Sequence, residues 1–211
     1  MKKRQPRPSY HHGDLRRVLL DASVEVLAER GTEAMSLRDV ARRAGVSPAA
    51  PYHHFASKEA LLDAIAHDGF FELARVMNEA GASVKNDPIA RIRAIGEAYI
   101  RFALDRPAHF HLMFRRTGDP RAHDDDIGGA FQVLLDAATD VVGVEGIGDR
   151  LAQRELVVLA WSVVHGAANL LLDGPLTRGI PSLGIEADAV PKMAVKTLET
   201  LILSLAGRKK R

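Results

Sequence analysis

The side chains best suited to bind a polyanion lie between residues 36 and 58, in the run SLRDVARRAGVSPAAPYHHFASK. Ser57 can cap a helix that begins at Lys58, which places an ammonium group beside backbone N–H groups that have no partner within the helix. Backbone N–H groups and an ammonium together form a site for a phosphate group. The run therefore predicts contact with the backbone of a nucleic acid.

A second set of residues in this run has the spacing of a helix with two distinct faces. Pro51 and Phe55 are four apart and share one side, whereas Ala49, Tyr52 and His53 share the opposite side. Because the outer face combines a small side chain with polar ones, it can approach base edges in a groove of DNA.

Two short helices around a tight turn are expected to position these residues. Ser36 can cap the first helix with Asp39 at its third position, and Gly45 stands where the chain must reverse through a left-handed conformation. Ser47 followed by Pro48 can cap the second helix. The buried face of the first helix would consist of Leu37, Val40, Ala41 and Ala44. This pattern is typical of a helix-turn-helix, whose second helix lies in the major groove.

A helix-turn-helix needs a third helix to complete its core, and the residues before Ser36 supply one. The expected helix runs from a cap at Asp14 to Gly31, and its apolar stripe comprises Leu15, Val18, Leu19, Ala22 and Val26. A Gly turn between amphipathic helices also occurs in enzymes, so this flanking helix strengthens the DNA-binding interpretation.

Composition argues against several other classes. The 211 residues include no cysteine, so neither a disulfide framework nor a thiolate metal site can form, and a reducing, cytoplasmic setting is expected. The sequence has no G-x-x-x-x-G-K, GxGxxG or HExxH motif, which argues against an enzyme. No apolar segment follows the MKKR start, so no secretory signal is expected. Residues 156–172 are slightly short for a membrane span, so a buried core helix is expected there.

The net charge of +2 conceals basic residues gathered at both ends. Residues 1–17 hold six Lys or Arg against one Asp, and residues 208–211 are all basic. The arm at residues 1–9 can lie along phosphates or enter a minor groove, or it can serve only to keep the chain soluble. The tail at residues 207–211 is expected only to keep the chain soluble.

The histidines suggest a metal site, but their spacing opposes it. His109 and His111 are two apart, so they point to nearly opposite sides of a helix, and the adjacent pairs His11–His12 and His53–His54 have the same difficulty. The run from His123 to Asp126 can bind a hard cation, but a solvated acidic turn is the simpler interpretation. We expect no metal and no cofactor.

The remainder of the chain has helical periodicity and no alternating strand pattern. The expected helices cover residues 58–81, 88–105, 108–114, 130–142, 149–172 and 187–206, with a polar loop over residues 117–129. The last two helices are apolar over a wide arc, so each needs a second partner beyond its own subunit. A two-fold four-helix bundle between subunits provides it; the alternative is a monomer with a large core. The expected fold is all-α, with about nine helices.

The ordered runs ERG, SLRDVARRAGVS and PYHHFASKEALL resemble the DNA-binding module of TetR-family transcriptional regulators, over about residues 10–65. By matching position, the resemblance implies that Ser36 and Lys58 contact phosphate and that Tyr52 and His53 contact the backbone or base edges. The residues it places nearest the bases are Ser47, Ala49 and Ala50. Such proteins more often have Leu, Ile or Val where this chain has Pro51, which lacks a backbone donor and is expected to tighten the first turn.

A second resemblance concerns Trp161, His165 and Gly166, a W-x-x-x-H-G group, together with the AHFHLMF run at residues 108–114. It is similar to a C-terminal domain of one TetR subgroup, which implies helical effector binding and dimerisation. A mostly apolar pocket can be formed by Phe102, Phe110, Met113, Phe114, Phe131, Trp161 and His165. The same residues can equally be core packing.

These observations predict a DNA-binding domain over residues 10–57 and an effector-binding and dimerisation domain over residues 58–206. The expected function is a ligand-responsive transcriptional regulator, a homodimeric repressor that binds a palindromic operator and is released by a small hydrophobic effector. The alternative is a helical protein-interaction adaptor without sequence-specific DNA binding, whose binding would lack the steep salt dependence of a DNA complex.

Overall fold

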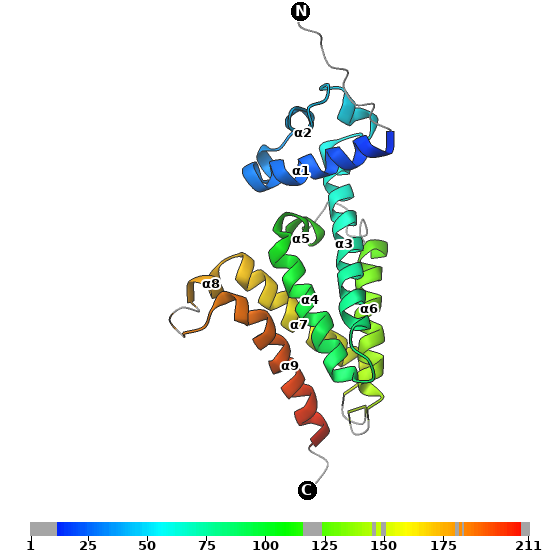
Figure 1. Ribbon diagram of the computed structural model, residues 1–211, viewed down its shortest axis with the longest axis vertical. Coiled ribbons are helices and arrows are strands. Elements are labelled where there is room, and N and C mark those ends of the chain that lie inside the picture. The colour runs from blue at the N-terminus through cyan, green and yellow to red at the C-terminus, as the bar shows by residue number, and fades with distance from the viewer. Residues whose placement is uncertain are drawn as a thin grey trace, which may run out of the picture. The chain divides into compact units, whose positions relative to one another are not determined.

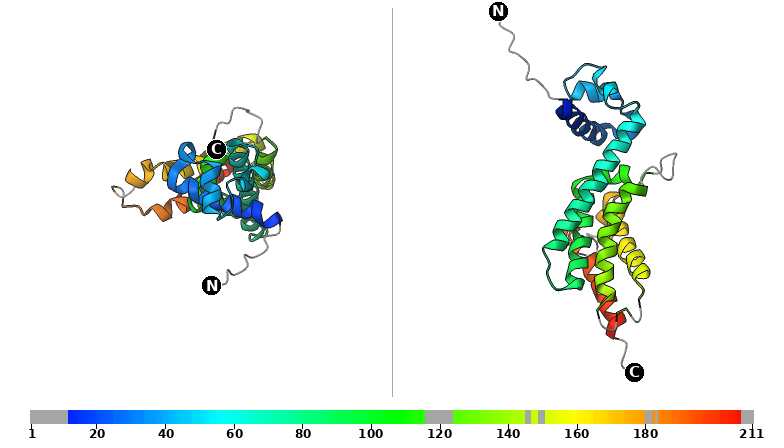
Figure 2. Two further views of the ribbon diagram at one scale, coloured as in Figure 1. Left: turned by 90° about the horizontal axis from the view of Figure 1, so that it is seen from above. Right: turned by 90° about the vertical axis from the view of Figure 1, so that its right-hand side faces the viewer.

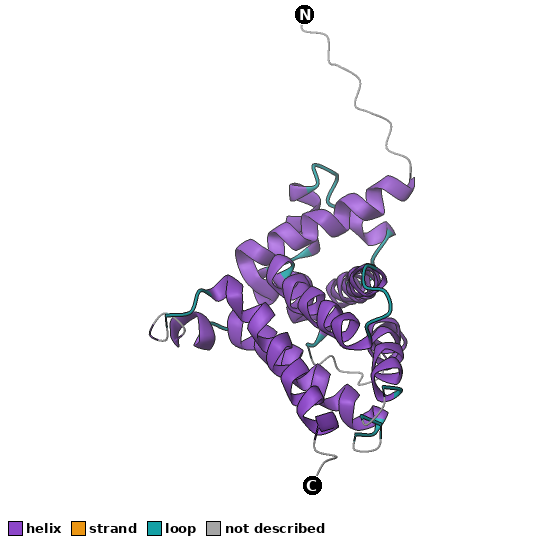
Figure 3. Ribbon diagram, turned by 60° about the horizontal axis from the view of Figure 1, so that its bottom comes forward, coloured by secondary structure: helices purple, strands orange, loops and turns teal. Residues whose placement is uncertain are grey.

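A computed structural model describes residues 12–115, 124–144, 147–148, 151–179, 182 and 184–207. Within these ranges the chain forms helices and no strand, which confirms the all-α prediction (Figures 1 and 3). The arm at residues 1–9, His11, His123 and the basic residues 208–211 lie outside them.

The elements are α1 (His12–Ala34), α2 (Leu37–Arg43), the 3-10 turn η1 (Ala50–His53), α3 (Lys58–Ala82), α4 (Pro88–Asp105), α5 (Pro107–Met113), α6 (Asp124–Val142), α7 (Gln153–Leu172), α8 (Pro175–Gly179), η3 (Ala187–Ala189) and α9 (Val190–Gly207).

The chain divides into two compact units, an N-terminal unit that ends at Ala66 and a C-terminal unit that begins at His67. The division falls inside α3, so this one helix contributes to both units. In the N-terminal unit α1 packs against α2, and α2 packs against η1. Its core consists of buried side chains that include Leu19, Val26, Leu37, Val40, Phe55, Leu61 and Ile65.

Local sequence signals end the first two helices of this unit. Gly31 leaves helical geometry with a φ of 72°, close to the predicted end of the first helix. That helix begins at His12, so the prediction that Asp14 caps it was wrong. Gly45 has a φ of 68°, and the N–H groups of Gly45 and Val46 donate to the carbonyls of Arg42 and Ala41. These two bonds are those of a Schellman motif and satisfy carbonyls left open by the helix end.

Helix α4 is the centre of the C-terminal unit. It packs against α5, α6, α7 and α9, an arrangement that can be followed in Figures 1 and 2. Gly96 of α4 permits a close approach, because a Cβ there would lie 3.0 Å from Val195 Cγ1 of α9 and 3.1 Å from Val164 Cγ1 of α7. The core of the unit is apolar and draws on α3, α4, α6, α7 and α9.

Three predicted boundaries in this unit needed correction. Helix α6 begins at Asp124 rather than at residue 130, so the second half of the expected polar loop is helical. Helix α7 begins at Gln153 rather than at residue 149, because the side chain of Glu155 accepts the N–H of Ala152 at 3.0 Å and closes the helix start there. A 3-10 turn occupies residues 187–189, and α9 follows from Val190.

Among the described helices, α7 is long and apolar enough to cross a membrane by length and composition alone. It packs instead against α4, α6, α8 and α9, and its buried residues include Leu156, Ala160 and Val164. This position agrees with the prediction of a buried core helix.

Candidate DNA-binding surface and effector cavity

The segment predicted to enter a DNA groove is a 3-10 turn rather than a regular α-helix. Pro48 and Ala49 form a turn, and η1 covers only Ala50 to His53. Pro51 has no N–H group to donate to Ser47, so the carbonyl of Ser47 accepts the N–H of Ala50 instead, at 3.0 Å. This tightened start was expected from Pro51, whereas the short extent of the helix was not. The prediction that Ser47 caps this helix was wrong, because its N-cap is Ala49 and no side chain caps it.

The two faces of this segment are divided as the spacing predicted. Pro51 and Phe55 are buried, and Arg16 lies 5.5 Å above the ring of Phe55. The opposite side is exposed, and Tyr52 shows 54% of its surface. Its exposed members are Ser47, Ala49, Tyr52 and His53, while Ala50 is half-buried. A row of small and polar side chains is therefore open to an external partner.

Ser36 caps α2 through its hydroxyl group, as predicted. Its Oγ accepts the N–H of Asp39 at 3.2 Å and donates to the carboxylate of the same residue. Arg30 and Arg42 contact the other carboxylate oxygen, at 3.0 and 2.7 Å. The Ser36 hydroxyl bond is the largest cause of a lowered pKa at Asp39, and the two guanidinium groups add to it. The start of α2 is thus a fixed, mixed-charge surface.

Lys58 and Ser57 lie at the beginning of α3. Ser57 Oγ accepts the N–H of Ala60 at 3.1 Å, which confirms the predicted cap. Lys58 Nζ donates to the carbonyl of Glu33 at 3.1 Å, near the end of α1. An ammonium has three donors, so this contact leaves capacity for a phosphate oxygen.

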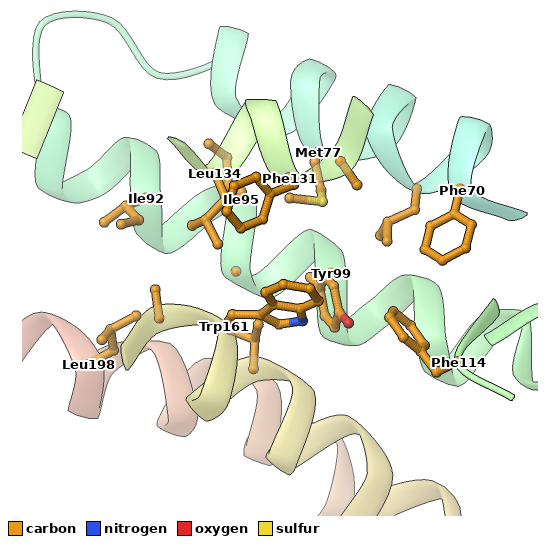
Figure 4. Close-up of a pocket in the computed structure, with 15 residues that line it drawn as sticks. Phe70, Met77, Ile92, Ile95, Tyr99, Phe114, Phe131, Leu134, Trp161 and Leu198 are labelled. Carbon is orange, nitrogen blue, oxygen red and sulfur yellow. The ribbon is translucent and has the colours of Figure 1, made fainter. Parts of the chain in front are cut away.

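A cavity lies within the C-terminal unit, between α3, α4, α6, α7 and α9 (Figure 4). Its volume is about 40 Å³, which admits a few water molecules at most. Pockets for organic ligands hold roughly 300–1,000 Å³, so a ligand must displace lining side chains. The lining residues are Phe70, Leu73, Met77, Ile92, Ile95, Gly96, Tyr99, Phe114, Ala130, Phe131, Leu134, Ala160, Trp161, Val164 and Leu198.

The predicted pocket residues divide between this lining and the surrounding core. Phe114, Phe131 and Trp161 line the cavity, and the rings of Phe131 and Trp161 are 5.7 Å apart. Three others are buried in the core without lining the cavity, namely Phe102, Phe110 and Met113. His165 lies directly behind the lining, with its ring centre 4.6 Å from that of Phe114.

Sequence reasoning missed Tyr99, the most polar lining residue. Its hydroxyl lies 2.8 Å from Nδ1 of His165, which is 66 positions away in the chain. Tyr99 belongs to the apolar stripe of α4, together with Ile92 and Ile95. The sequence did show that a phenol lies on this apolar stripe, which indicates a buried polar group. No spacing in the sequence indicated that His165 is its hydrogen-bond partner.

Burial sets the ionisation of this polar pair. It raises the pKa of Tyr99, and the indole N–H of Trp161 opposes that rise by hydrogen bonding to the phenol. Burial also lowers the pKa of His165. Both groups therefore stay neutral near pH 7, since the charged form of each is the one that burial disfavours.

His109 and His111 face different neighbours. Nε2 of His109 lies 3.8 Å from Asp68 on α3, whereas Nε2 of His111 lies 3.7 Å from Asp173 after α7. His109 is buried and His111 is exposed. The two side chains therefore contact different parts of the unit, as their spacing of two residues on a helix predicted.

Two family models match separate parts of the chain. Residues 19–65 match the bacterial regulatory proteins of the tetR family, and residues 92–196 match the tetracyclin repressor-like C-terminal domain. The first match contains the helix-turn-helix, and the second contains most of the cavity lining. Both models describe regulatory proteins, which agrees with the prediction that the chain is not an enzyme.

Individual relatives agree with these models. The HTH-type transcriptional regulator BetI of Rhizobium meliloti is 35% identical over 91 residues, which make up 43% of this chain and 43% of that regulator. The match thus spans less than half of the curated relative. A solved protein of unknown function from Rhodococcus sp. RHA1 is 31% identical, with a TM-score of 0.77 over 92% of this chain and 98% of that one.

A second solved structure supports the fold alone. The TetR-family transcriptional regulator PfmR of Thermus thermophilus is 22% identical, with a TM-score of 0.62 over 86% of this chain and 97% of its own. The two family models agree with the helix-turn-helix and its exposed outer face, and with the helical unit around an apolar cavity. The chain belongs to the TetR family of bacterial regulatory proteins.

Proposed function

We propose that this protein is a homodimeric transcriptional repressor that binds a palindromic operator and is released by a small hydrophobic effector bound in the cavity. Helix α3 is the single observation that carries this proposal. It begins at Lys58, close in sequence to the segment predicted to enter a DNA groove (residues 47–55, the recognition segment), and continues to Ala82. Phe70, Leu73 and Met77 of the same helix line the cavity. A ligand that displaces them acts directly on the helix that enters the DNA-binding unit.

The proposed DNA-binding roles rest on matching position in the tetR-family model, which covers residues 19–65. Ser36 and Lys58 contact phosphate groups, and Tyr52 and His53 contact the backbone or base edges. The residues nearest the bases are Ser47, Ala49 and Ala50. An operator in the bacterial chromosome also requires a cytoplasmic location.

Exposed apolar side chains on α7 and α9 support the homodimer. Val158 is 66% exposed on α7, and Met193 and Leu203 are 46% and 48% exposed on α9. Pairing of these helices across a two-fold axis would bury them, and a palindromic operator requires two recognition segments about one turn of DNA apart, roughly 34–36 Å. A hundredfold loss of operator affinity on effector binding would need about 2.7 kcal/mol of coupling, within the usual range.

Substitution of two DNA-facing residues tests the proposal. Tyr52→Ala and Lys58→Ala should each weaken binding to an operator selected from random duplexes by about tenfold, because each removes a direct contact. The Lys58→Ala dimer should also show a smaller dependence of log Kd on log salt, by about one unit for each phosphate group that is no longer bound. Fluorescence anisotropy of labelled operator at several salt concentrations measures both quantities.

Matched variants control for fold and charge. Lys85→Ala removes the same charge from an exposed position between α3 and α4, and Phe71→Ala removes an exposed aromatic ring from the C-terminal unit. Neither should change operator affinity. Wild-type binding that shows no salt dependence would indicate an adaptor rather than a DNA-binding regulator.

A further inference from the structure

Among the residues that the structure describes, no charged side chain lines the cavity. Its 15 lining residues provide only two side-chain nitrogen or oxygen atoms, the hydroxyl oxygen of Tyr99 and the indole nitrogen of Trp161 (Figure 4). An ionised group buried among them would lose its hydration without gaining a counter-ion, which is strongly unfavourable. A hydrocarbon with no polar atom would add no acceptor for the indole N–H.

The hydrogen bond between Tyr99 and His165 has the phenol as donor when the ring of His165 carries its proton on Nε2. The ring of His165 is neutral, so its Nδ1 can accept the proton of the Tyr99 hydroxyl across 2.8 Å. In this tautomer the phenol proton is already engaged. The indole N–H of Trp161 is donor-only, and its nitrogen lies on the side of the Tyr99 hydroxyl (Figure 4). A ligand that displaces Trp161 from the phenol leaves the indole N–H without its acceptor, and a ligand oxygen then supplies a new one. This makes the indole N–H the donor that the cavity can offer.

Three lining aromatic residues, namely Phe114, Phe131 and Trp161, are partly exposed. Met77 is a buried, unbranched side chain in the lining that can change rotamer to enlarge the space. Figure 4 shows Trp161 between Phe114 and the aliphatic residues Ile92 and Leu198, so its indole N–H lies in the middle of the lining.

We infer that the cavity takes an uncharged, apolar molecule with one hydrogen-bond-accepting oxygen, a carbonyl or a hydroxyl, held by the indole N–H of Trp161. This inference rests on the proposed function, because it specifies the effector of the same cavity. The inference excludes ions as ligands of this cavity, both carboxylates and quaternary ammonium compounds.

A series of eight-carbon probes tests the inference on the full-length protein. The probes are n-octane, 2-octanone, 1-octanol, octanoate and octyltrimethylammonium. Trp161 is the only tryptophan in the chain, so its fluorescence reports occupancy of the cavity. The ketone and the alcohol should bind at least about threefold more tightly than octane, the gain expected from one hydrogen bond, and at least about tenfold more tightly than either ion.

Two variants separate the hydrogen bond from packing. Trp161→Phe keeps an aromatic ring without the N–H, so it should bind 2-octanone and octane equally, as measured by ligand-dependent shifts of Tm. Phe131→Leu changes a lining residue that has no polar atom, so it should weaken all probes alike and keep the preference for the ketone. Tighter binding of either ion, a ketone preference that survives in Trp161→Phe, or no binding of any probe would overturn the inference.

Operator binding by the same samples distinguishes this inference from the proposed function. Protein that binds its operator but prefers a charged probe contradicts only the identity of the effector. Protein that binds 2-octanone but no selected duplex contradicts the proposed function and leaves the cavity chemistry as inferred.

Discussion

Burial, rather than a neighbouring charge, governs the polar residues of the cavity. The Tyr99 hydroxyl and the His165 ring share a hydrogen bond of 2.8 Å inside an apolar core. Burial moves the pKa of Tyr99 up and that of His165 down, so each group favours its neutral form. The lowered pKa of His165 links folding to pH.

Acid should therefore destabilise the protein partly through His165. Its folded-state pKa lies below the ordinary value of 6.5, so the unfolded chain binds a proton more readily than the folded chain. The contribution is fully present above about pH 6.5 and is lost as the pH falls from there towards the folded-state pKa. Thermal unfolding at pH 7.5 and 5.5 should show a fall in Tm that is smaller in His165→Gln.

His111→Gln is the matched control for this measurement, because it removes an exposed imidazole from α5. It should retain the pH dependence of the wild-type protein. Identical pH profiles for wild-type protein and His165→Gln would show that His165 does not contribute.

At the scale of helices, the close packing of α4 on α7 and α9 holds the C-terminal unit together. Gly96 makes it possible, since a side chain at this position would press against Val164 and Val195. Gly166 of α7 differs, because a Cβ at that position would meet no atom within 4 Å. The two glycines of neighbouring helices therefore give opposite expectations for the same substitution.

Gly96→Ala should lower the free energy of unfolding by about 1–3 kcal/mol, because overpacking outweighs the gain in helix propensity. Gly166→Ala should raise it by about 0.5–1 kcal/mol through that propensity alone. Urea unfolding followed by circular dichroism measures both. Equal effects of the two substitutions would contradict the close contact at Gly96.

At the scale of the whole molecule, the proposed dimer is formed by exposed apolar residues on α7 and α9. A regulator with one recognition segment reads half of a palindrome, so pairing of two subunits multiplies its affinity. Val158 is the most exposed apolar residue on α7. A charge at this position would have to be buried in the proposed interface.

Val158→Glu should therefore give a monomer in sedimentation velocity and lower operator affinity by about a hundredfold. Phe71→Glu introduces the same charge at a residue of α3 that is 70% exposed and lies outside α7 and α9. It should remain a dimer. A monomeric wild-type protein, or a dimeric Val158→Glu, would contradict the proposed assembly.

Several elements were predictable because their signals are local. Ser36, Gly45 and Ser57 form the expected caps and turn, since their hydrogen bonds connect residues within a few positions of one another. The buried side of the recognition segment, with Pro51 and Phe55, follows from the same short-range periodicity. The 3-10 geometry of η1 and the starts of α6 and α7 depend on the balance of competing backbone hydrogen bonds, which spacing alone does not settle.

The sequence by itself determined the all-helical fold, the helix-turn-helix and the family, because periodicity, capping and motif order are properties of neighbouring residues. Only the tertiary structure decided which aromatic residues line the cavity and which are core, and it joined Tyr99 to His165 across 66 positions. The physical reason is that helix packing brings distant side chains together. A helix's apolar stripe indicates that it is buried, but not which helix it contacts.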